Sequence, residues 1–154
     1  MRNTTLCYIE KDNSYLMLYR NKKKNDENEG KYVGIGGHFL ENESPYDCVV
    51  REAFEETGLH ISPVYRGIVT FVSDKYECEQ MHLFTCSQFS GKMCTCNEGE
   101  LVFVEKNDLK SIPMWEGDHI FFDLLNEKKD FFNLKLVYEG EKLISYSIDG
   151  VKIR

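Results

Sequence analysis

The sequence predicts an α/β fold in which strands alternate irregularly with two helices. The chain has 154 residues, of which 42% are hydrophobic and 13% aromatic, so it can bury a substantial core. Short apolar segments bounded by polar turns indicate strands. Two segments, 45–57 and 119–128, have helical features instead, and their spacing does not form a regular βαβ series. We expect one domain that covers residues 1–154.

The N-terminal part favours strands around a polar loop. Residues 4–9 and 15–20 indicate two strands joined by a hairpin turn at residues 11–13, and residues 31–33 indicate a short third strand. Residues 21–30 between them contain no apolar side chain, which predicts a surface loop. Its lysines Lys22, Lys23 and Lys24 are candidate phosphate contacts, the alternative being a solvated loop. Lys24 is our candidate substrate-binding residue here.

The segment 45–57 has the start and stop signals of a helix. Ser44 is a suitable N-cap, Pro45 suits the first helical position, and Asp47 completes a capping box. Gly58 suits the left-handed residue that ends such a helix. We expect the apolar face to bury four side chains against a sheet, namely Tyr46, Val50, Ala53 and Phe54.

The same helix carries a cluster of acids. Glu52, Glu55 and Glu56 are three or four positions apart or adjacent, so they lie on one side near the helix end. Arg51 can offset part of their repulsion. A glycine-rich turn at residues 34–37 precedes the helix and lets the backbone approach phosphate or metal closely. Clustered carboxylates suit Mg²⁺ or Mn²⁺, and the alternative is a solvated acidic face.

These residues together resemble a complete Nudix box. Its positions are Gly37, then Glu43 after five residues, then REAFEETGL at residues 51–59 after seven more. The resemblance implies an α/β/α sandwich with a mixed sheet. It also implies hydrolysis of a nucleoside diphosphate linked to another group, with a divalent metal as cofactor.

The resemblance implies a role for individual residues. Glu52, Glu55 and Glu56 match the metal-binding positions, and the carbonyl of Gly36 is a further candidate ligand. Arg51 matches the residue that orients these glutamates, and Glu43 matches a glutamate with a structural role. Gly37 is a candidate substrate contact. Many Nudix enzymes recruit one more carboxylate as metal ligand or general base, for which we expect Glu98, with Glu100 as the alternative.

The C-terminal half completes the expected sheet. Strands are indicated at 64–72, 81–89 and 101–104 and as a hairpin at 131–138 and 143–148, with a turn or short helix at 107–109. A second helix is expected from His119 to about Lys128, with Asp118 as its cap. Trp115, the only tryptophan, can stack on a nucleobase or pack in the core.

A weaker resemblance links residues 112–148 to MutT-type 8-oxo-purine nucleoside triphosphatases, which implies that Trp115 and Asp118 bind the base. In vertebrate members two successive acids follow the tryptophan, whereas here the pair is Gly117 and Asp118. Val33 stands where those members carry an asparagine.

The expected activity is Mg²⁺-dependent hydrolysis of a nucleoside triphosphate, such as 8-oxo-dGTP, to nucleoside monophosphate and pyrophosphate. Alternatives are a Nudix pyrophosphatase of ADP-ribose or a dinucleoside polyphosphate and, from another class, a non-catalytic nucleotide-binding regulator.

Charge and cysteine content narrow the class of partner. The net charge of −7 argues against general binding to nucleic acid or to an acidic membrane, whereas bound Mg²⁺ would reverse the local sign for a nucleotide. The six cysteines form no C-x-x-C pair, and no apolar run approaches the ~18 residues that span a bilayer. We therefore expect a cytoplasmic protein with reduced thiols, a monomer or homodimer, whose partner is a small-molecule nucleotide.

Overall fold

The structure of the protein is a computed structural model, and it describes residues 1–22, 26–127 and 130–154. Lys24 and the expected helix end at Lys128 lie outside the described residues. The strands are β1 (Arg2–Lys11), β2 (Ser14–Tyr19), β3 (Tyr32–Val33), β4 (Leu59–Ser73), β5 (Glu79–Gly91), β6 (Glu100–Glu105), β7 (Phe132–Glu139), β8 (Lys142–Ile148) and β9 (Val151–Lys152). The helices are α1 (Pro45–Thr57), the 3₁₀-helix η1 (Lys106–Ser111) and α2 (Glu116–Glu127).

The strands form a mixed sheet, as the sequence predicts. Their order is β3-β2-β1-β5-β4-β7-β8-β9, and β6 pairs with β2 off this path. The pairs β1–β5 and β4–β7 are parallel, and the remaining pairs are antiparallel. The two parallel pairs join strands that are distant in sequence, so residues from both halves of the chain meet at the centre of the sheet.

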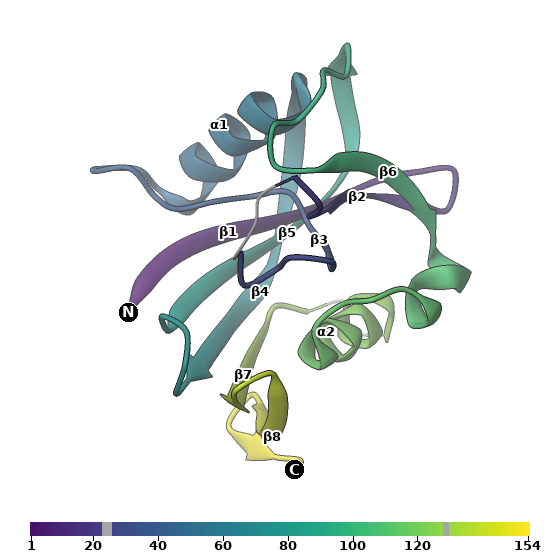
Figure 1. Cartoon of the computed structure of the whole chain (residues 1–154). Helices are drawn as coiled ribbons and strands as arrows, with labels where there is room; N and C mark the ends of the chain where they lie inside the picture. The colour runs from purple at the N-terminus through teal and green to yellow at the C-terminus, as the bar shows by residue number, and fades with distance from the viewer. Residues whose placement is uncertain (23–25, 128–129) are drawn as a thin grey trace.

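Two separate cores lie on the two faces of this sheet. Leu83 and Phe84 are consecutive in β5, so their side chains point to opposite faces, and they belong to different cores. The core with Phe84 contains Val49 and Ala53 of α1, whereas the core with Leu83 contains side chains of α2. Figure 1 shows α1 and α2 on opposite sides of the strands. The expected α/β/α sandwich is therefore confirmed.

Helix α1 has the predicted bounds and caps, but its buried face is different from the predicted one. The Ser44 side chain accepts from the Asp47 N–H, the reciprocal bond of the capping box is present, and Gly58 is left-handed with φ 78°. Tyr46 and Phe54 are 53% and 49% exposed, so the expectation that both are buried is wrong. The buried side chains of the helix are Cys48, Val49, Ala53 and Thr57.

Other boundaries differ because tertiary pairing extends the local signals. Strands β4 and β5 are longer than predicted, since they pair with each other from Leu59–Gly91 to Phe71–Glu79. Helix α2 begins at Glu116, so Asp118 lies inside its first turn and the prediction of a cap at Asp118 is wrong. In the described part of the chain, no helix has the length and apolar character needed to cross a membrane.

Candidate active site

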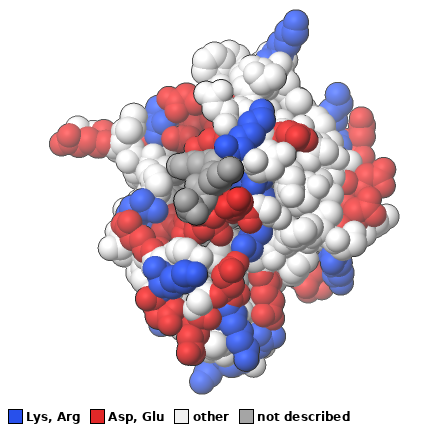
Figure 2. All heavy atoms as spheres, viewed as in Figure 1, with Lys and Arg blue, Asp and Glu red and all other residues white. Residues whose placement is uncertain are grey.

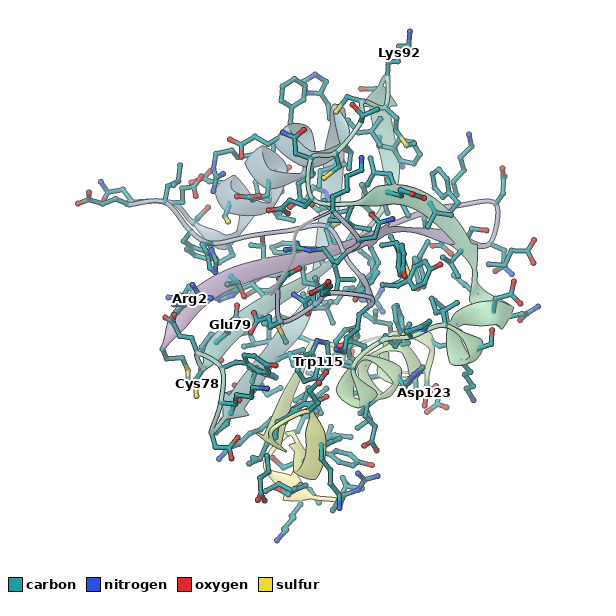
Figure 3. All side chains as sticks on the ribbon, viewed as in Figure 1. Arg2, Cys78, Glu79, Lys92, Trp115 and Asp123 are labelled. Atoms are coloured by element: carbon teal, nitrogen blue, oxygen red, sulfur yellow. The ribbon has the colours of Figure 1, made fainter. Side chains whose placement is uncertain are left out.

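A cleft of about 960 Å³ connects the acidic end of α1 with the start of α2. Thr4, Leu6 and Tyr8 of β1 line it, and Leu6 and Tyr8 belong to the face of the sheet that packs against α2. Figure 3 shows Trp115 beside α2, and Arg2 and Glu79 near the ends of their strands. The charged lining residues are Arg2, Arg20, Asp26, Glu27, His38, Arg51, Glu52, Glu55, Glu56, Glu79, Glu98 and Asp118. On the face drawn in Figure 2, acidic and basic side chains lie next to one another.

A glycine turn brings α1 against β1. Residues 35–38 run beside β1 through the bridges Cys7–Ile35 and Thr4–His38, and Thr5 N–H donates to the Gly37 carbonyl at 2.9 Å. A Cβ on Gly36 would lie 1.9 Å from the Thr5 carbonyl oxygen, so only glycine fits there. A Cβ on Gly37 would lie 2.5 Å from the carboxyl carbon of Glu52. The turn therefore sets the position of Glu52.

Arg51 is the centre of a hydrogen-bonded group of acids. Its guanidinium donates to both oxygens of Glu43 at 2.7 and 2.9 Å, to Glu52 at 2.8 Å and to Glu55 at 3.1 Å. It also donates to the His38 carbonyl at 3.0 Å. These bonds from Arg51 lower the pKa of Glu43 to about 2. Arg51 thus holds Glu52 and Glu55 in a fixed orientation beside the glycine turn.

Glu56 differs from the other acids because it is largely buried and, among the described residues, has no cationic partner in contact. The Gly36 N–H hydrogen-bonds its carboxyl group, but Oε2 has no hydrogen-bond partner among the described residues. Burial, followed by the charges of Glu52 and Glu98, raises the pKa of Glu56 to about 8. A buried carboxylate oxygen without a partner, facing two further carboxylates, is an arrangement that a divalent cation would stabilise.

The two candidates for the additional carboxylate occupy different places. Glu98 lines the cleft and accepts a hydrogen bond from Arg20 Nη1 at 3.0 Å. Glu100 is exposed, accepts from Asn21 at 3.0 Å, and does not line the cleft. The structure therefore brings Glu98, and not Glu100, to the α1 glutamates.

The residues present fit a hard divalent cation, although they do not form a finished cage. Carboxylate oxygens gather at one end of the cleft, and oxygen ligands are those that Mg²⁺ and Mn²⁺ prefer. No group of three His, Cys, Asp or Glu side chains among the described residues is already arranged as a ligand set. Three of these carboxylates are bound by arginines instead, Glu52 and Glu55 by Arg51 and Glu98 by Arg20.

The opposite end of the cleft is aromatic. Trp115 is 9% exposed, belongs to the core around α2, and packs edge-on against Tyr138 at 5.1 Å between ring centroids. Its indole N–H donates to Asn28 Oδ1 at 2.8 Å, and Lys31 Nζ lies 4.8 Å from the ring centroid. Trp115 is thus a core residue that also borders the cleft, and its stacking on a nucleobase stays a prediction.

Asp118 is a buried acid at this aromatic end. It is 8% exposed, and burial raises its pKa to about 8 against the opposing charge of Lys31. Its carboxyl group is therefore mainly neutral at pH 7 and can both donate and accept a hydrogen bond. The buried Tyr8 hydroxyl, which also has no hydrogen-bond partner among the described residues, borders the same part of the cleft.

Among the polar cleft residues that sequence reasoning missed, Arg20 and Asn28 make hydrogen bonds to distant parts of the chain. Arg20 follows β2 directly, and a charged residue at the end of an apolar strand was the only signal available for it. Asn28 lies in the polar segment 21–30, where it cannot be told from its neighbours by composition. Both residues are joined to distant parts of the chain, namely to Glu98 and Trp115.

The sequence is similar to a known protein family and to several of its members. The NUDIX domain model matches residues 1–125. The chain is 29% identical to the Nudix hydrolase YvcI of Bacillus subtilis (strain 168) over 161 aligned positions, which cover 100% of this chain and 98% of that protein. It is 26% identical to the mouse oxidized purine nucleoside triphosphate hydrolase over 131 positions, 84% of each chain.

The fold is also similar to solved structures. A crystal structure of a mutator MutT protein from Bacillus halodurans matches with a TM-score of 0.86 and 24% identity, over 97% of this chain and 98% of that chain. A MutT NUDIX hydrolase from Burkholderia pseudomallei matches with a TM-score of 0.70 and 21% identity, over 79% and 95%. The family match over most of the chain, together with the complete glutamate motif on α1, shows that this protein is a hydrolase of the NUDIX family.

Proposed function

We propose that this chain is a Mg²⁺-dependent pyrophosphohydrolase of purine nucleoside triphosphates, with oxidised purines among its substrates. The observation that carries the proposal is one continuous cleft with carboxylates at one end and Trp115 with Asp118 at the other. This arrangement matches the polarity of a nucleotide, whose phosphates need cations and whose base needs a flat apolar wall with a few polar groups. The name of the mouse relative, an oxidized purine nucleoside triphosphate hydrolase, supports the substrate class.

The acidic end would hold the metal through Glu52, Glu55, Glu56 and Glu98, with the Gly36 carbonyl as a further ligand. When bound there, Mg²⁺ or Mn²⁺ neutralises phosphate charge and makes a water molecule more acidic. Arg51 keeps Glu52 and Glu55 oriented through its hydrogen bonds. Glu56 or Glu98 accepts a proton from the attacking water, whose oxygen bonds to phosphorus while the bond between α- and β-phosphates breaks. The products are nucleoside monophosphate and pyrophosphate.

The aromatic end would bind the base. Trp115 borders the cleft as a rigid wall, and a neutral Asp118 offers both a donor and an acceptor to the edge of a purine. Gly117 replaces the first of the two acids seen in vertebrate MutT-type proteins, and Val33 replaces an asparagine. The Asn28 amide, which also lines the cleft, supplies a polar group that could take part of their place.

The proposal is tested by a hydrolysis screen with Mg²⁺ over oxidised and normal purine and pyrimidine nucleoside triphosphates, ADP-ribose and dinucleoside polyphosphates. We expect the highest kcat/KM for a purine triphosphate, with monophosphate and pyrophosphate as products. Glu55→Gln should lower turnover by about 100-fold or more at unchanged stability, because Glu55 is largely exposed. A preference for ADP-ribose or a dinucleoside polyphosphate would move the chain to another Nudix substrate class, and inactivity on every substrate would indicate a nucleotide-binding regulator.

A further inference from the structure

Arg20 connects two acids from different loops at the acidic end of the cleft, the end where the proposed function places the metal (the metal end). Its Nε donates to Asp26 at 2.7 Å and its Nη1 donates to Glu98 at 3.0 Å. The side chains of Arg20 and Asp26 are only 13% and 9% exposed, whereas that of Glu98 is 39% exposed. The Arg20–Asp26 pair is therefore a fixed ion pair, and Glu98 is the partner that can move away from it.

The Arg20 charge also acts on Glu56, which makes no ion pair within the part of the chain that the structure describes. Glu98 raises the pKa of Glu56 and Arg20 lowers it, so the three side chains share one electrostatic environment. Arg51 already binds Glu52 and Glu55 on the other side. In this structure, arginines therefore provide the positive charge that a divalent cation would provide to the same carboxylates.

Arg51 and Arg20 differ in how easily a cation can displace them from the carboxylates. Arg51 makes bonds to five residues, and three of them, Glu43, Cys48 and the His38 carbonyl, are not proposed ligands and keep its guanidinium in place. Arg20 makes a single bond to the metal-end acids, the one to Glu98. Loss of that bond leaves Arg20 paired with Asp26. A cation can therefore take the place of Arg20 at Glu98 without leaving the Arg20 charge uncompensated.

We propose that Arg20 is a counter-ion that a divalent cation displaces from Glu98, so that Arg20 sets the metal affinity of the site. This inference rests on the proposed metal site and goes beyond it by assigning a role to a residue that is not one of the ligands. A cation that binds Glu98 competes with the guanidinium for the Glu98 carboxylate, whose Oε2 accepts the bond from Arg20. The metal-free form is thus stabilised by the Arg20–Glu98 bond, and this stabilisation is subtracted from the free energy of metal binding.

The segment that pairs with Arg20 also connects the two ends of the cleft. Asp26 and Asn28 lie in the same short segment, in which the Glu29 N–H donates to the Asp26 carbonyl and the Lys31 N–H donates to the Asn28 carbonyl. The Arg20 carbonyl accepts from the Gly30 N–H at 2.8 Å, so the segment is fixed to Arg20 at both its backbone and its side chain. Asn28 in turn holds the Trp115 indole. Arg20, which keeps its pair with Asp26 when Glu98 leaves, is therefore joined to a segment that contacts the base end.

The test is a titration of the nucleotide-free protein with Mn²⁺, followed by EPR or calorimetry, for the wild type and Arg20→Gln. We expect Arg20→Gln to bind Mn²⁺ about tenfold more tightly, which corresponds to the loss of one competing ion pair. In a Glu98→Gln background the same substitution should change the Mn²⁺ Kd by less than about twofold, because the bond that it removes is already absent. The matched control is Arg2→Gln, since Arg2 lines the same cleft but pairs with Glu77 at 3.1 Å, and its Kd should equal that of the wild type.

Arg20→Lys provides a second variant, because Arg20→Gln leaves the buried Asp26 without its cation and thermal unfolding will show how much stability is lost. A single ammonium retains the pair with Asp26 and cannot bridge both acids, so its Mn²⁺ affinity should lie between those of the wild type and Arg20→Gln. An unchanged or weaker Mn²⁺ affinity in both variants, with wild-type binding and hydrolysis intact, would overturn the exchange alone. An equal gain in the Glu98→Gln background would also overturn it, in favour of general charge repulsion. A wild type that neither binds Mn²⁺ nor hydrolyses nucleotides would overturn the proposed function together with the exchange.

Discussion

At the scale of the residue, the cleft is organised by which carboxylates have an arginine partner and which do not. Glu43 is held ionised by Arg51, whereas Glu56 and Asp118 are buried with raised pKa values. Acids with strongly raised pKa values in a cleft indicate a functional site more often than a structural one. The same sequence of acids therefore divides into supporting and reactive groups only after burial and pairing are known.

Glu98 and Glu100 offer a matched pair of substitutions. Glu98→Gln should lower kcat/KM by about 100-fold, because it removes a carboxylate that lines the metal end of the cleft. Glu100→Gln should leave kcat/KM within about twofold of the wild type, since its side chain is exposed outside the cleft. Steady-state kinetics on the best substrate will measure both. A larger loss in Glu100→Gln than in Glu98→Gln would show that the wrong acid has been chosen.

Asp118 predicts a pH dependence of stability. An unfolded aspartate has a pKa of about 3.9, and in the folded chain the pKa is about 8. The folded state therefore holds the Asp118 proton more tightly, so this contribution to stability is complete below pH ~4 and is lost as the pH rises to ~8. The difference in unfolding free energy between the wild type and Asp118→Asn should fall by on the order of 3 kcal/mol from pH 5 to pH 8.

Urea unfolding of the metal-free proteins at pH 5, 6.5 and 8 will measure this difference. Because Glu56 is present in both proteins, its own raised pKa cancels in the comparison. A difference that is constant over this range would mean that Asp118 is ionised in the folded state.

At the scale of the element, the glycine turn and α1 act as one unit. The turn is fixed to β1 by backbone hydrogen bonds, and α1 is fixed by its capping box and by the burial of Val49 and Ala53. This arrangement places Glu52 directly against Gly37. Metal-end geometry is therefore a property of the turn as much as of the helix.

Two alanine substitutions in this turn should have different effects. In Gly36→Ala the new Cβ would meet the Thr5 backbone at 1.9 Å, so the turn or β1 must move and stability should fall by roughly 2 kcal/mol or more. In Gly37→Ala the Cβ would meet the end of the Glu52 side chain, which can rotate away. Its stability should change by less than ~1 kcal/mol while kcat falls roughly 10- to 100-fold. Thermal unfolding and kinetics on the same samples distinguish the two, and equal losses of stability would contradict this assignment.

The elements that local signals specify were predictable. The caps of α1, the hairpin between β1 and β2, and the box glutamates each depend on residues a few positions apart. The buried face of α1 could not be predicted in the same way, because Phe54 stacks on the exposed His60, with 4.7 Å between the ring centroids, instead of entering the core. The start of α2 was placed too late, because the buried Asp118 resembles an N-cap in sequence.

At the scale of the whole molecule, the cleft depends on contacts between residues that are far apart in sequence. Arg20 meets Glu98 and Asn28 meets Trp115, separations of 78 and 87 positions. The first pair follows from the antiparallel pairing of β2 with β6, in which Tyr19 lies opposite Glu100, and the second lies beside the hydrogen bond from the Tyr32 N–H to the Pro113 carbonyl. No local pattern specifies either contact. This is why the acidic end of the cleft could be inferred from the box, whereas the side of the cleft formed by Arg20 and Asn28 could not be inferred from the sequence.

In the proposed function, a nucleotide would lie along the cleft from the α1 glutamates to Trp115. The most direct test is a crystal structure of the protein with Mg²⁺ and a non-hydrolysable purine nucleoside triphosphate. We expect Mg²⁺ at about 2.1 Å from carboxylate oxygens of Glu52 and Glu56, with phosphates on the cation and the base next to Trp115 and Asp118. A nucleotide bound elsewhere, or bound in this cleft with its phosphates directed toward Trp115, would contradict the proposed function.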